Sequence, residues 1–421
     1  MKEQHFDVLI VGAGMVGSAL ATALGSQKLK VAVFDRTLPE PFQPDQLPDL
    51  RVSALSYASE HILRQLGAWE PMRKMRMCPY RKMAVWEKLD GSLAAIKGRP
   101  NQTVFDASAI RYAQLGFIAE NRVTQLGLHQ AMAQHHSIEL FCPAEIEKIT
   151  LVNNASPRIQ LSNGQCFTGR LLVGADGANS KVRKAACLGL SQQDYQQHCL
   201  VATAEIKGGC QDITWQAFTP TGPESFLPLP DINGKSYASI VWYHHPEVIK
   251  QLKALSDDDF ISEIRNTFPE ELPPLVRLHE KGSFPLSRRH AQRYYRPGVV
   301  LAGDAAHTIN PLAGQGVNLG FQDMAWLAEI LMDAHKAGED IGSPKVLARY
   351  EAARRADNQR MMTIMDGFYH TFSNDHPPLK LIRNMGLTLA GKMTPAVKQV
   401  MKYAMGLSGK QPRLARGLPL V

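Results

Sequence analysis

The sequence predicts an α/β protein with a parallel sheet, because one pattern occurs three times along the 421 residues. Each time, a short apolar run that is typical of a buried strand leads into a turn with glycine or aspartate. These segments are residues 6–17, 171–183 and 299–304. In an open α/β sheet, ligands bind outside the carboxyl ends of the strands, where such turns lie. The three segments therefore predict a ligand site at one edge of a sheet.

The first segment has the order of a dinucleotide-binding unit, namely strand, glycine turn, helix, second strand and acid. Gly12 would allow the tight turn, Gly14 would let the backbone approach a pyrophosphate, and Gly17 would let the helix and the strand pack closely. Asp35, which follows the second strand, can accept hydrogen bonds from ribose hydroxyls. The motif predicts a bound dinucleotide but does not distinguish FAD from a nicotinamide.

The second segment, residues 171–183, leads from an apolar strand into Asp176, Gly177 and Arg183. One interpretation is a further contact to the dinucleotide. The other is structural, because an aspartate and a serine before a helix, here Asp176 and Ser180, commonly accept hydrogen bonds from its free N–H groups. Taken alone, the segment favours neither interpretation.

The third segment ends a buried strand at Gly303 and Asp304, so that a carboxylate lies at the strand tip. Apolar residues from Val317 onwards recur at roughly helical spacing, which predicts a helix that begins near Gly316. The free N–H groups and the positive end of that helix would face the same loop. An acid and a helix N-terminus are therefore expected to approach one ligand.

Taken together, in this order and at these separations, the three segments resemble the single-component flavin aromatic hydroxylases, the relatives of p-hydroxybenzoate hydroxylase. The resemblance implies a Rossmann-like FAD-binding domain. Its glycine motif would hold the ADP half of FAD, its Asp176 segment would serve both the flavin and NAD(P)H, and its Asp304 would bind the ribityl chain. The full set of implied cofactor-binding residues is Gly12, Gly14, Gly17, Asp35, Arg51, Asn121, Gln125, Asp176, Gly177, Arg183, Gly303, Asp304, Pro311, Gly314, Gly316 and Asn318.

Residues 310–323, Asn-Pro-Leu-Ala-Gly-Gln-Gly-Val-Asn-Leu-Gly-Phe-Gln-Asp, resemble the signature of the ubiquinone-biosynthesis hydroxylases within that family. Residues 215–220, 226–229, 284–291 and 372–374 resemble bacterial members of the same branch. The resemblance implies a monooxygenase in which NADPH or NADH reduces FAD and dioxygen forms a flavin C4a-hydroperoxide. That species would hydroxylate the ring of a polyprenylated methoxy-methyl-benzoquinol. Two alternatives stay open, namely a sister hydroxylase that acts at another ring position and an FAD-containing assembly subunit of the pathway.

Between residues 190 and 282 the pattern changes to short strands separated by proline and glycine, which predicts a sheet that could cover a planar ring. We therefore expect an interleaved β-sheet substrate domain and C-terminal helices beside the FAD-binding domain. The expected segments are 1–75, 105–189 and 283–345 for the FAD-binding domain, 76–104 and 190–282 for the sheet domain, and 346–421 for the helical, basic C-terminal part.

No catalytic acid or base follows from the sequence. His307 lies beside Asp304, but a histidine in a tight loop is more often a packed hydrogen-bond partner. The aromatic residues between positions 190 and 282 are ambiguous in a similar way, because they could line a ring pocket or form ordinary core. These residues are Phe218, Phe226, Trp242 and Tyr243.

The formal net charge of +8 is confined to the C-terminal part. Residues 376–421 contain eight lysines and arginines and no acid, whereas the preceding residues contain equal numbers of basic and acidic side chains. Apolar residues alternate with these cations, which predicts amphipathic helices interrupted at Gly391 and Pro395. Such helices could pack on the body of the protein, or dock on an anionic membrane or on other ubiquinone-pathway proteins. No nucleic-acid-binding motif accompanies the charge, so no nucleic-acid partner is expected.

The six cysteines form no CxxC pair, and no histidine cluster has the spacing of metal ligands, so neither a disulfide framework nor a metal site is expected. This cysteine usage predicts a reducing, cytoplasmic location. The basic C-terminal part adds peripheral attachment at the inner face of the membrane to that expectation. The expected small-molecule partners are FAD, NADPH or NADH, dioxygen and the quinol.

Overall fold

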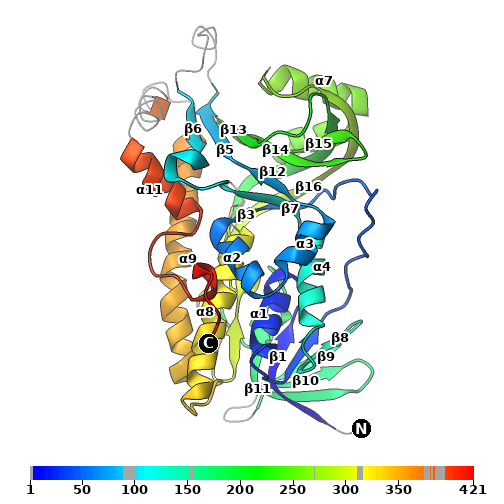
Figure 1. Cartoon of the computed structure of the whole chain (residues 1–421). Helices are drawn as coiled ribbons and strands as arrows, with labels where there is room; N and C mark the ends of the chain where they lie inside the picture. Colours follow the sequence, from blue (N-terminus) through cyan, green and yellow to red (C-terminus); the bar gives the residue numbers. More distant parts are fainter. Residues whose placement is uncertain are drawn as a thin grey trace.

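Figure 1 shows the computed structural model of the chain, which contains a mainly parallel sheet and a second, largely antiparallel sheet, with long helices beside them. The structure describes residues 3–88, 101–151, 156–269, 271–310, 316–373, 380, 383–384 and 394–421. The mixture of parallel strands and helices confirms the predicted α/β class.

The parallel strands of the first sheet follow the order β18-β11-β1-β2-β8, with β17 antiparallel at one edge and β10 and β9 extending from β11. Val8, Leu9 and Ile10 of β1 are fully buried, as expected for a strand that is covered on both faces. The strands are β1 (Gln4–Val11), β2 (Val31–Phe34), β8 (Ile138–Phe141), β9 (Ile146–Thr150), β10 (Arg158–Leu161), β11 (Cys166–Gly174), β17 (Tyr295–Arg296) and β18 (Val299–Leu301).

Helices pack around this sheet and share one apolar core with it, which includes Leu20 of α1, Leu128 of α4, Phe321 of α8 and Tyr350 of α9. Helix α1 consists of small and apolar residues and is buried from Gly17 onwards, so it can lie close to its neighbours. The helices are α1 (Met15–Gly25), α2 (Tyr57–Gln65), α3 (Trp69–Met75), α4 (Asn121–Met132), α5 (Lys181–Ala185), α8 (Gly316–Lys336) and α9 (Pro344–Phe372).

The second sheet has the order β19-β16-β12-β15-β14-β13-β5-β6. Helices α6 (Pro246–Ala254) and α7 (Asp257–Thr267) cover one of its faces through a separate core that includes Phe226, Ile240 and Phe260. The strands are β5 (Lys82–Glu87), β6 (Thr103–Asp106), β12 (Leu190–Ile206), β13 (Ile213–Thr219), β14 (Gly222–Ile232), β15 (Lys235–His244), β16 (Leu275–Ala291) and β19 (His307–Thr308).

The sheet predicted between residues 190 and 282 is confirmed, but several of its strands are longer than predicted. Strands β12 and β16 each extend over 17 residues, and α6 and α7 lie between β15 and β16 in the chain. Gly282 and Pro285 lie inside β16 and do not end it. A Cβ at Gly282 would lie 2.6 Å from Leu50 Cδ2, so this glycine serves a close approach within the strand instead of a turn.

A three-stranded sheet, β3-β7-β4, packs against the second sheet through a core that includes Ile118, Leu229 and Tyr237. Its strands are β3 (Val52–Ser56), β4 (Cys78–Tyr80) and β7 (Gly116–Glu120), and short 3-10 turns occur at η2 (Ala107–Ile110), η3 (Gly303–Ala305) and η4 (Leu414–Arg416). Leu55 of β3 and Ala119 of β7 also belong to the apolar core of the first sheet, so this small sheet contacts both cores.

The C-terminal helix α11 (Thr394–Ala404) packs on the body of the protein. Met401 and Met405 are buried, and with the partly buried Val397 they join an apolar cluster around Leu115. Pro395 lies in the first turn of α11, where proline is tolerated, so it marks a helix start. Gly391, the other predicted interruption, lies outside the described residues. Among the described residues, no helix is long and apolar enough to cross a membrane.

Replacing Phe260 by alanine should lower the free energy of unfolding by about 3–5 kcal/mol, because its fully buried ring fills the core beneath the second sheet. Urea denaturation would measure the loss. Val276→Ala, at a side chain that is 45% exposed, should change the same quantity by less than about 0.5 kcal/mol. Equal effects of the two substitutions would contradict the core that we describe.

Candidate functional site

Four strands of the first sheet end at the same level. Val11 of β1 lies opposite both Gly174 of β11 and Phe34 of β2, and Gly174 lies opposite Leu301 of β18. Since these strands are parallel, the turns that follow them leave from one edge of the sheet. These turns carry Gly12, Gly14, Asp35, Asp176, Gly177, Gly303 and Asp304, and Gly17 lies in the first turn of α1.

The glycine motif uses glycine for two different reasons. A Cβ at Gly12 would lie 2.3 Å from the carbonyl oxygen of Ala175, and one at Gly17 would lie 1.9 Å from that of Gly12, so close packing requires both glycines. A Cβ at Gly14, in contrast, would meet nothing within 4 Å. Gly14 also caps α1 without a side-chain hydrogen bond, which leaves the first N–H groups of the helix to a ligand. This arrangement suits a phosphate.

The peptide of Ala13, inside the glycine motif, is held from two sides. Its N–H donates to Asp35 Oδ2 (2.6 Å), and its carbonyl oxygen accepts from Gln125 Nε2 (2.9 Å) and His129 Nε2 (2.8 Å). Asp35 and Gln125 therefore shape the turn, and the Asp35 carboxylate retains acceptor capacity for ribose hydroxyls. His129 belongs to no motif, so the sequence alone did not identify it.

Arg51 and Asn121 lie at adjoining ends of the paired strands β3 and β7. The Asn121 N–H donates to the carbonyl oxygen of Arg51 (3.0 Å), and Asn121 Oδ1 accepts from Ser53 Oγ (2.6 Å). The Arg51 side chain is exposed and lies near enough to Asp304 to lower the pKa of that carboxyl. The structure thus places a cation beside the acid of the third segment.

Asp304 lies in the turn η3, directly after β18. Its side chain is exposed to solvent, yet desolvation by the surrounding protein still raises the pKa of its carboxyl against the opposing influence of His307 and Arg51. Within the described part of the chain, its carboxylate accepts no hydrogen bond. An exposed carboxylate without a protein partner is available to the hydroxyl groups of a ligand.

Asp323 of α8 is the centre of a buried network beneath this turn. Its Oδ2 accepts the N–H of Gly303 (3.1 Å) and pairs with His307 Nε2 (2.5 Å). Its Oδ1 accepts from Arg354 Nε (2.8 Å) and Asn358 Nδ2 (3.0 Å). Burial acts to raise the pKa of Asp323, but His307 and Arg354 outweigh it and hold that pKa well below its usual range. The interpretation of His307 as a packed hydrogen-bond partner is confirmed.

The second segment contains a helix cap. Asp176 Oδ2 accepts the N–H groups of Lys181 (2.6 Å) and Val182 (3.2 Å), and Ser180 Oγ accepts that of Arg183 (2.9 Å), so the capping interpretation is confirmed. The buried Asp176 Oδ1 has no hydrogen-bond partner among the described residues, so the same side chain can still bind a ligand.

Arg183 is buried and donates from Nη1 to the carbonyl oxygen of Ala305 (2.7 Å) and from Nη2 to that of Ala178 (2.8 Å). Its guanidinium therefore holds the turn of Asp304 against the second segment. Burial lowers the pKa of Arg183, although the negative charge of Asp176 acts in the opposite direction.

Helix α8 begins at Gly316, as predicted. Asn318 in its first turn accepts at Oδ1 from the Ser56 N–H (2.9 Å) and from Ser59 Oγ (2.7 Å), and it donates from Nδ2 to the Ala54 carbonyl oxygen (2.9 Å). Its side chain thus ties α8 to the β3–α2 junction. The other predicted residues of this loop, Pro311 and Gly314, lie outside the described residues.

Each of the four aromatic residues of the second sheet belongs to a packed cluster, but the core interpretation is confirmed only for the two that lie under α6 and α7. Trp242 and Phe226 lie in the core under α6 and α7. Tyr243 packs in a cluster with Ile309 on the opposite face, and the Phe218 ring stacks on that of Phe372 at 4.3 Å between centroids.

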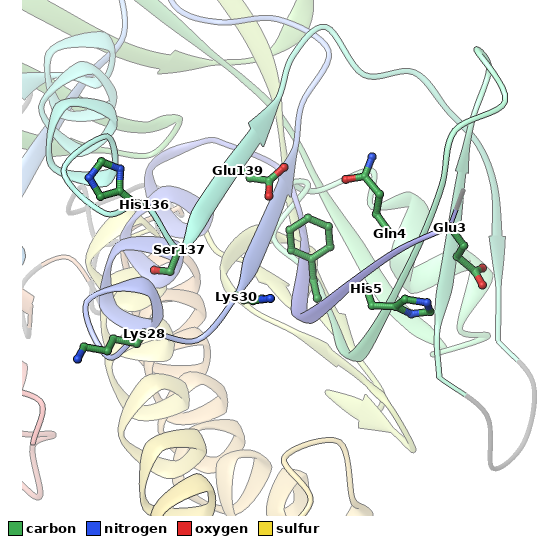
Figure 2. Close-up of a pocket in the computed structure, with 9 residues that line it drawn as sticks. Glu3, Gln4, His5, Lys28, Lys30, His136, Ser137 and Glu139 are labelled. Carbon is green, nitrogen blue, oxygen red and sulfur yellow. The ribbon is translucent and has the colours of Figure 1, made fainter. Parts of the chain in front are cut away.

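Figure 2 shows a cavity of about 620 Å³ at the other end of the first sheet. It lies at the amino ends of β1, β2 and β8 and is lined by residues such as His5, Lys30 and Glu139. Since the turns described above leave from the carboxyl ends, this cavity is not part of their site.

The described residues contain no cluster of acids, histidines or cysteines that could hold a metal ion.

Comparison with known families identifies the class of protein. A family model described as an FAD binding domain matches residues 5–364. The chain belongs to this family. It is 41% identical over 407 residues to the 3-demethoxyubiquinol 3-hydroxylase of Escherichia coli. This alignment covers 97% of this chain and 100% of that protein. It is also 34% identical to the ubiquinone hydroxylase UbiL of Rhodospirillum rubrum, in an alignment that covers 98% of this chain and 93% of that protein.

Solved structures give the same fold. PqsL, a probable FAD-dependent monooxygenase from Pseudomonas aeruginosa, matches with a TM-score of 0.75 at 20% identity and covers 91% of this chain and 99% of that one. The p-nitrophenol 4-monooxygenase PnpA from Pseudomonas putida matches with a TM-score of 0.76 at 18% identity. This match covers 97% of this chain and 100% of that one. The predicted flavin-hydroxylase fold is therefore confirmed. With the curated relatives, the family match shows a flavin-dependent aromatic monooxygenase of the ubiquinone-biosynthesis branch.

Asp323→Asn should lower the free energy of unfolding by about 3–5 kcal/mol, because it leaves the buried Arg354 guanidinium without its charged partner. Urea denaturation would measure this loss. Asp333→Asn, an exposed position on the same helix, is the matched control and should change stability by less than about 0.5 kcal/mol. A loss at Asp323 as small as that at Asp333 would show that the network contributes little.

Proposed function

We propose that this flavoprotein hydroxylates the ring of a polyprenylated methoxy-methyl-benzoquinol in ubiquinone biosynthesis. Dioxygen would be the oxygen source, and NADPH or NADH the reductant. Similarity to the Escherichia coli hydroxylase over 97% of the chain supports this substrate class. The observation that carries the proposal is the convergence of three turns at one sheet edge, where Gly14 leaves open space and Asp304 has a carboxylate without a partner in the described chain.

The residues at this edge fit FAD. The uncapped start of α1 suits the pyrophosphate, Asp35 suits the adenosine ribose, and Asp304 suits the ribityl hydroxyls. Arg51 adds a positive charge for the phosphates. Bound there, FAD would accept a hydride from the nicotinamide and activate dioxygen, a chemistry that side chains do not supply.

The protein itself would contribute position and electrostatics. The N-terminal part of α8 lies beside the turn η3, and a helix N-terminus stabilises negative charge that develops nearby, here on a reduced flavin ring. His307 is buried and bonded to Asp323, so we do not assign it as a general base. Oxygen transfer to an electron-rich ring carbon then depends on how the ring is held.

We assign the quinol ring to the face of the second sheet that is opposite α6 and α7. Ala238 and Ile240 of β15 belong to the core under these helices, so Ser239 between them faces the other way. Thr203 lies opposite Ser239 in the ladder. Both hydroxyls are fully buried and have no hydrogen-bond partner among the described residues. Buried hydroxyls are normally paired, and the ring oxygens of a quinol would pair them once binding displaces the side chains that cover this face.

Complementation tests the reaction and separates it from that of a sister enzyme. Expression of the chain should restore ubiquinone in an Escherichia coli strain that lacks its 3-demethoxyubiquinol 3-hydroxylase, as measured by mass analysis of extracted lipids. The same plasmid should fail in strains that lack a hydroxylase for another ring position. Rescue of such a strain alone would favour the sister reaction.

Asp304→Asn should raise the dissociation constant of FAD by about 10- to 100-fold, because this is the usual effect of losing a hydrogen bond to a charged group. Titration of the apoprotein with FAD, followed by flavin fluorescence, measures the dissociation constant. Asp45→Asn, at an exposed acid, is the matched control and should bind as the wild type does. A folded Asp304→Asn protein that has lost FAD yet still supports ubiquinone synthesis would instead favour the assembly-subunit alternative.

We further propose that the C-terminal part docks on an anionic membrane, from which a polyprenylated substrate would be taken. Met401 of α11 and Met405, which directly follows this helix, pack on the body, while Val400 is 54% exposed and Lys402 is exposed. An exposed apolar side chain among lysines is typical of helices that lie on an anionic lipid surface. One side of α11 would then pack on the body of the protein, and the other side would dock on the membrane.

Charge reversal tests this docking. The double substitution Lys398→Glu and Lys402→Glu should lower co-sedimentation with anionic liposomes about tenfold or more, because each lysine contributes roughly 1 kcal/mol near such a surface. Lys250→Glu with Lys253→Glu on α6 makes the same charge change elsewhere and should have little effect. Equal binding by the two variants would contradict docking through α11.

A further inference from the structure

Two cysteines that lie far apart in the sequence meet at the junction of the three-stranded sheet and the second sheet. Cys78 begins β4, and Cys210 lies in the connection between β12 and β13. Their Sγ atoms are 3.4 Å apart and form a hydrogen bond. Cys78 is buried, whereas Cys210 is exposed. Neither residue belongs to the sheet edge that carries the glycine motif and Asp304.

We propose that Cys78 and Cys210 are a redox-active pair that hydrogen peroxide converts to a disulfide. The proposal does not depend on the hydroxylase reaction or on its substrate. It assigns Cys210 as the thiol that meets the oxidant and Cys78 as the thiol that resolves it.

The two thiols differ in the way that these roles require. The hydrogen bond from Cys78 lowers the pKa of the Cys210 thiol, although burial and the carboxylates of Asp231 and Asp212 oppose this effect. The same hydrogen bond, together with burial, raises the pKa of Cys78. An accessible thiol with a lowered pKa beside a second thiol is the usual arrangement of a cysteine that forms a reversible disulfide.

The backbone geometry permits the bond to close. The N–H groups of Arg81 and Lys82 both donate to the carbonyl oxygen of Asp212, at 2.6 and 3.1 Å, so the two chain segments are already held together beside the cysteines. Gly208 and Gly209 precede Cys210 with φ values of +95° and +89°, and a Cβ on either would meet nothing within 4 Å. The sulfurs must approach by about 1.4 Å to reach bonding distance, and this glycine turn has room to supply the shift.

The chemical step balances without a further reactant. The Cys210 thiolate attacks one oxygen of peroxide, breaks the O–O bond and becomes a sulfenic acid, and the other oxygen leaves as water after taking up a proton. Cys78 then attacks the Cys210 sulfur and displaces a second water. The two thiols lose two electrons to peroxide, and their two protons end in water. The product links β4 to the β12–β13 connection.

Peroxide treatment of the purified holoenzyme tests the pair, with the exposed Cys187 replaced by serine to remove a competing thiol. With alkylation carried out after denaturation, we expect the loss of two thiols, a non-reduced peptide that joins Cys78 to Cys210, and recovery of both thiols with dithiothreitol. Oxidation of Cys210 to sulfinic acid without a cross-link would overturn the proposal, and so would two thiols that survive peroxide unchanged.

Single substitutions separate the two roles. In Cys78→Ser, peroxide should carry Cys210 to a sulfinic acid that dithiothreitol does not reverse, because no resolving thiol remains. If Cys78→Ser does not fold, the exposed Cys210→Ser provides the test, since Cys78 should then resist peroxide in the folded protein and become alkylatable only after denaturation. Rapid oxidation of Cys78 in Cys210→Ser would show that the roles are wrong.

Discussion

The buried carboxylate of Asp323 joins three parts of the chain on which the site depends. It binds the N–H of Gly303 at the end of β18, His307 in the following loop, and Arg354 and Asn358 on α9. A fully buried charge is tolerated only when it is paired and hydrogen-bonded. These contacts therefore hold α8 and α9 in a defined position relative to the end of β18. The turn that exposes Asp304 is consequently held by the residues on both sides of it.

Two glycines that pack against Val16 bring the N-terminal parts of α1 and α8 close together. A Cβ at Gly320 of α8 would lie 2.6 Å from Val16 Cγ2 of α1, and one at Gly303 would lie 3.1 Å from the same atom. Gly303 also has φ +62°, which a larger residue rarely adopts. Both glycines therefore allow α1, α8 and the turn η3 to meet. The positive ends of two helices can thus act on one anionic cofactor.

The sequence predicted the parts of the site that follow from local pattern and from the geometry of parallel strands. A strand, a turn and an acid are recognisable within a few residues, and parallel strands must release their turns at one edge. His129, Arg354 and Asn358 could not be found in this way, because their partners lie far away in the sequence and no motif includes them. The two faces of β15 were similarly undetermined, since alternation separates Trp242 from Ser239 but does not say which face the helices cover.

The second sheet is continuous with the turn that carries Asp304. His307 and Thr308 form β19, which pairs with β16 so that Thr308 lies opposite Arg289 and His307 opposite His290. His307 also binds Asp323, so one residue belongs both to the sheet ladder and to the buried network below η3. A displacement of β16 would therefore pull on the Asp304 turn directly. This shared hydrogen bonding fixes the distance between the sheet that we assign to the ring and the carboxylate that we assign to the ribityl chain, as oxygen transfer between two planar rings requires.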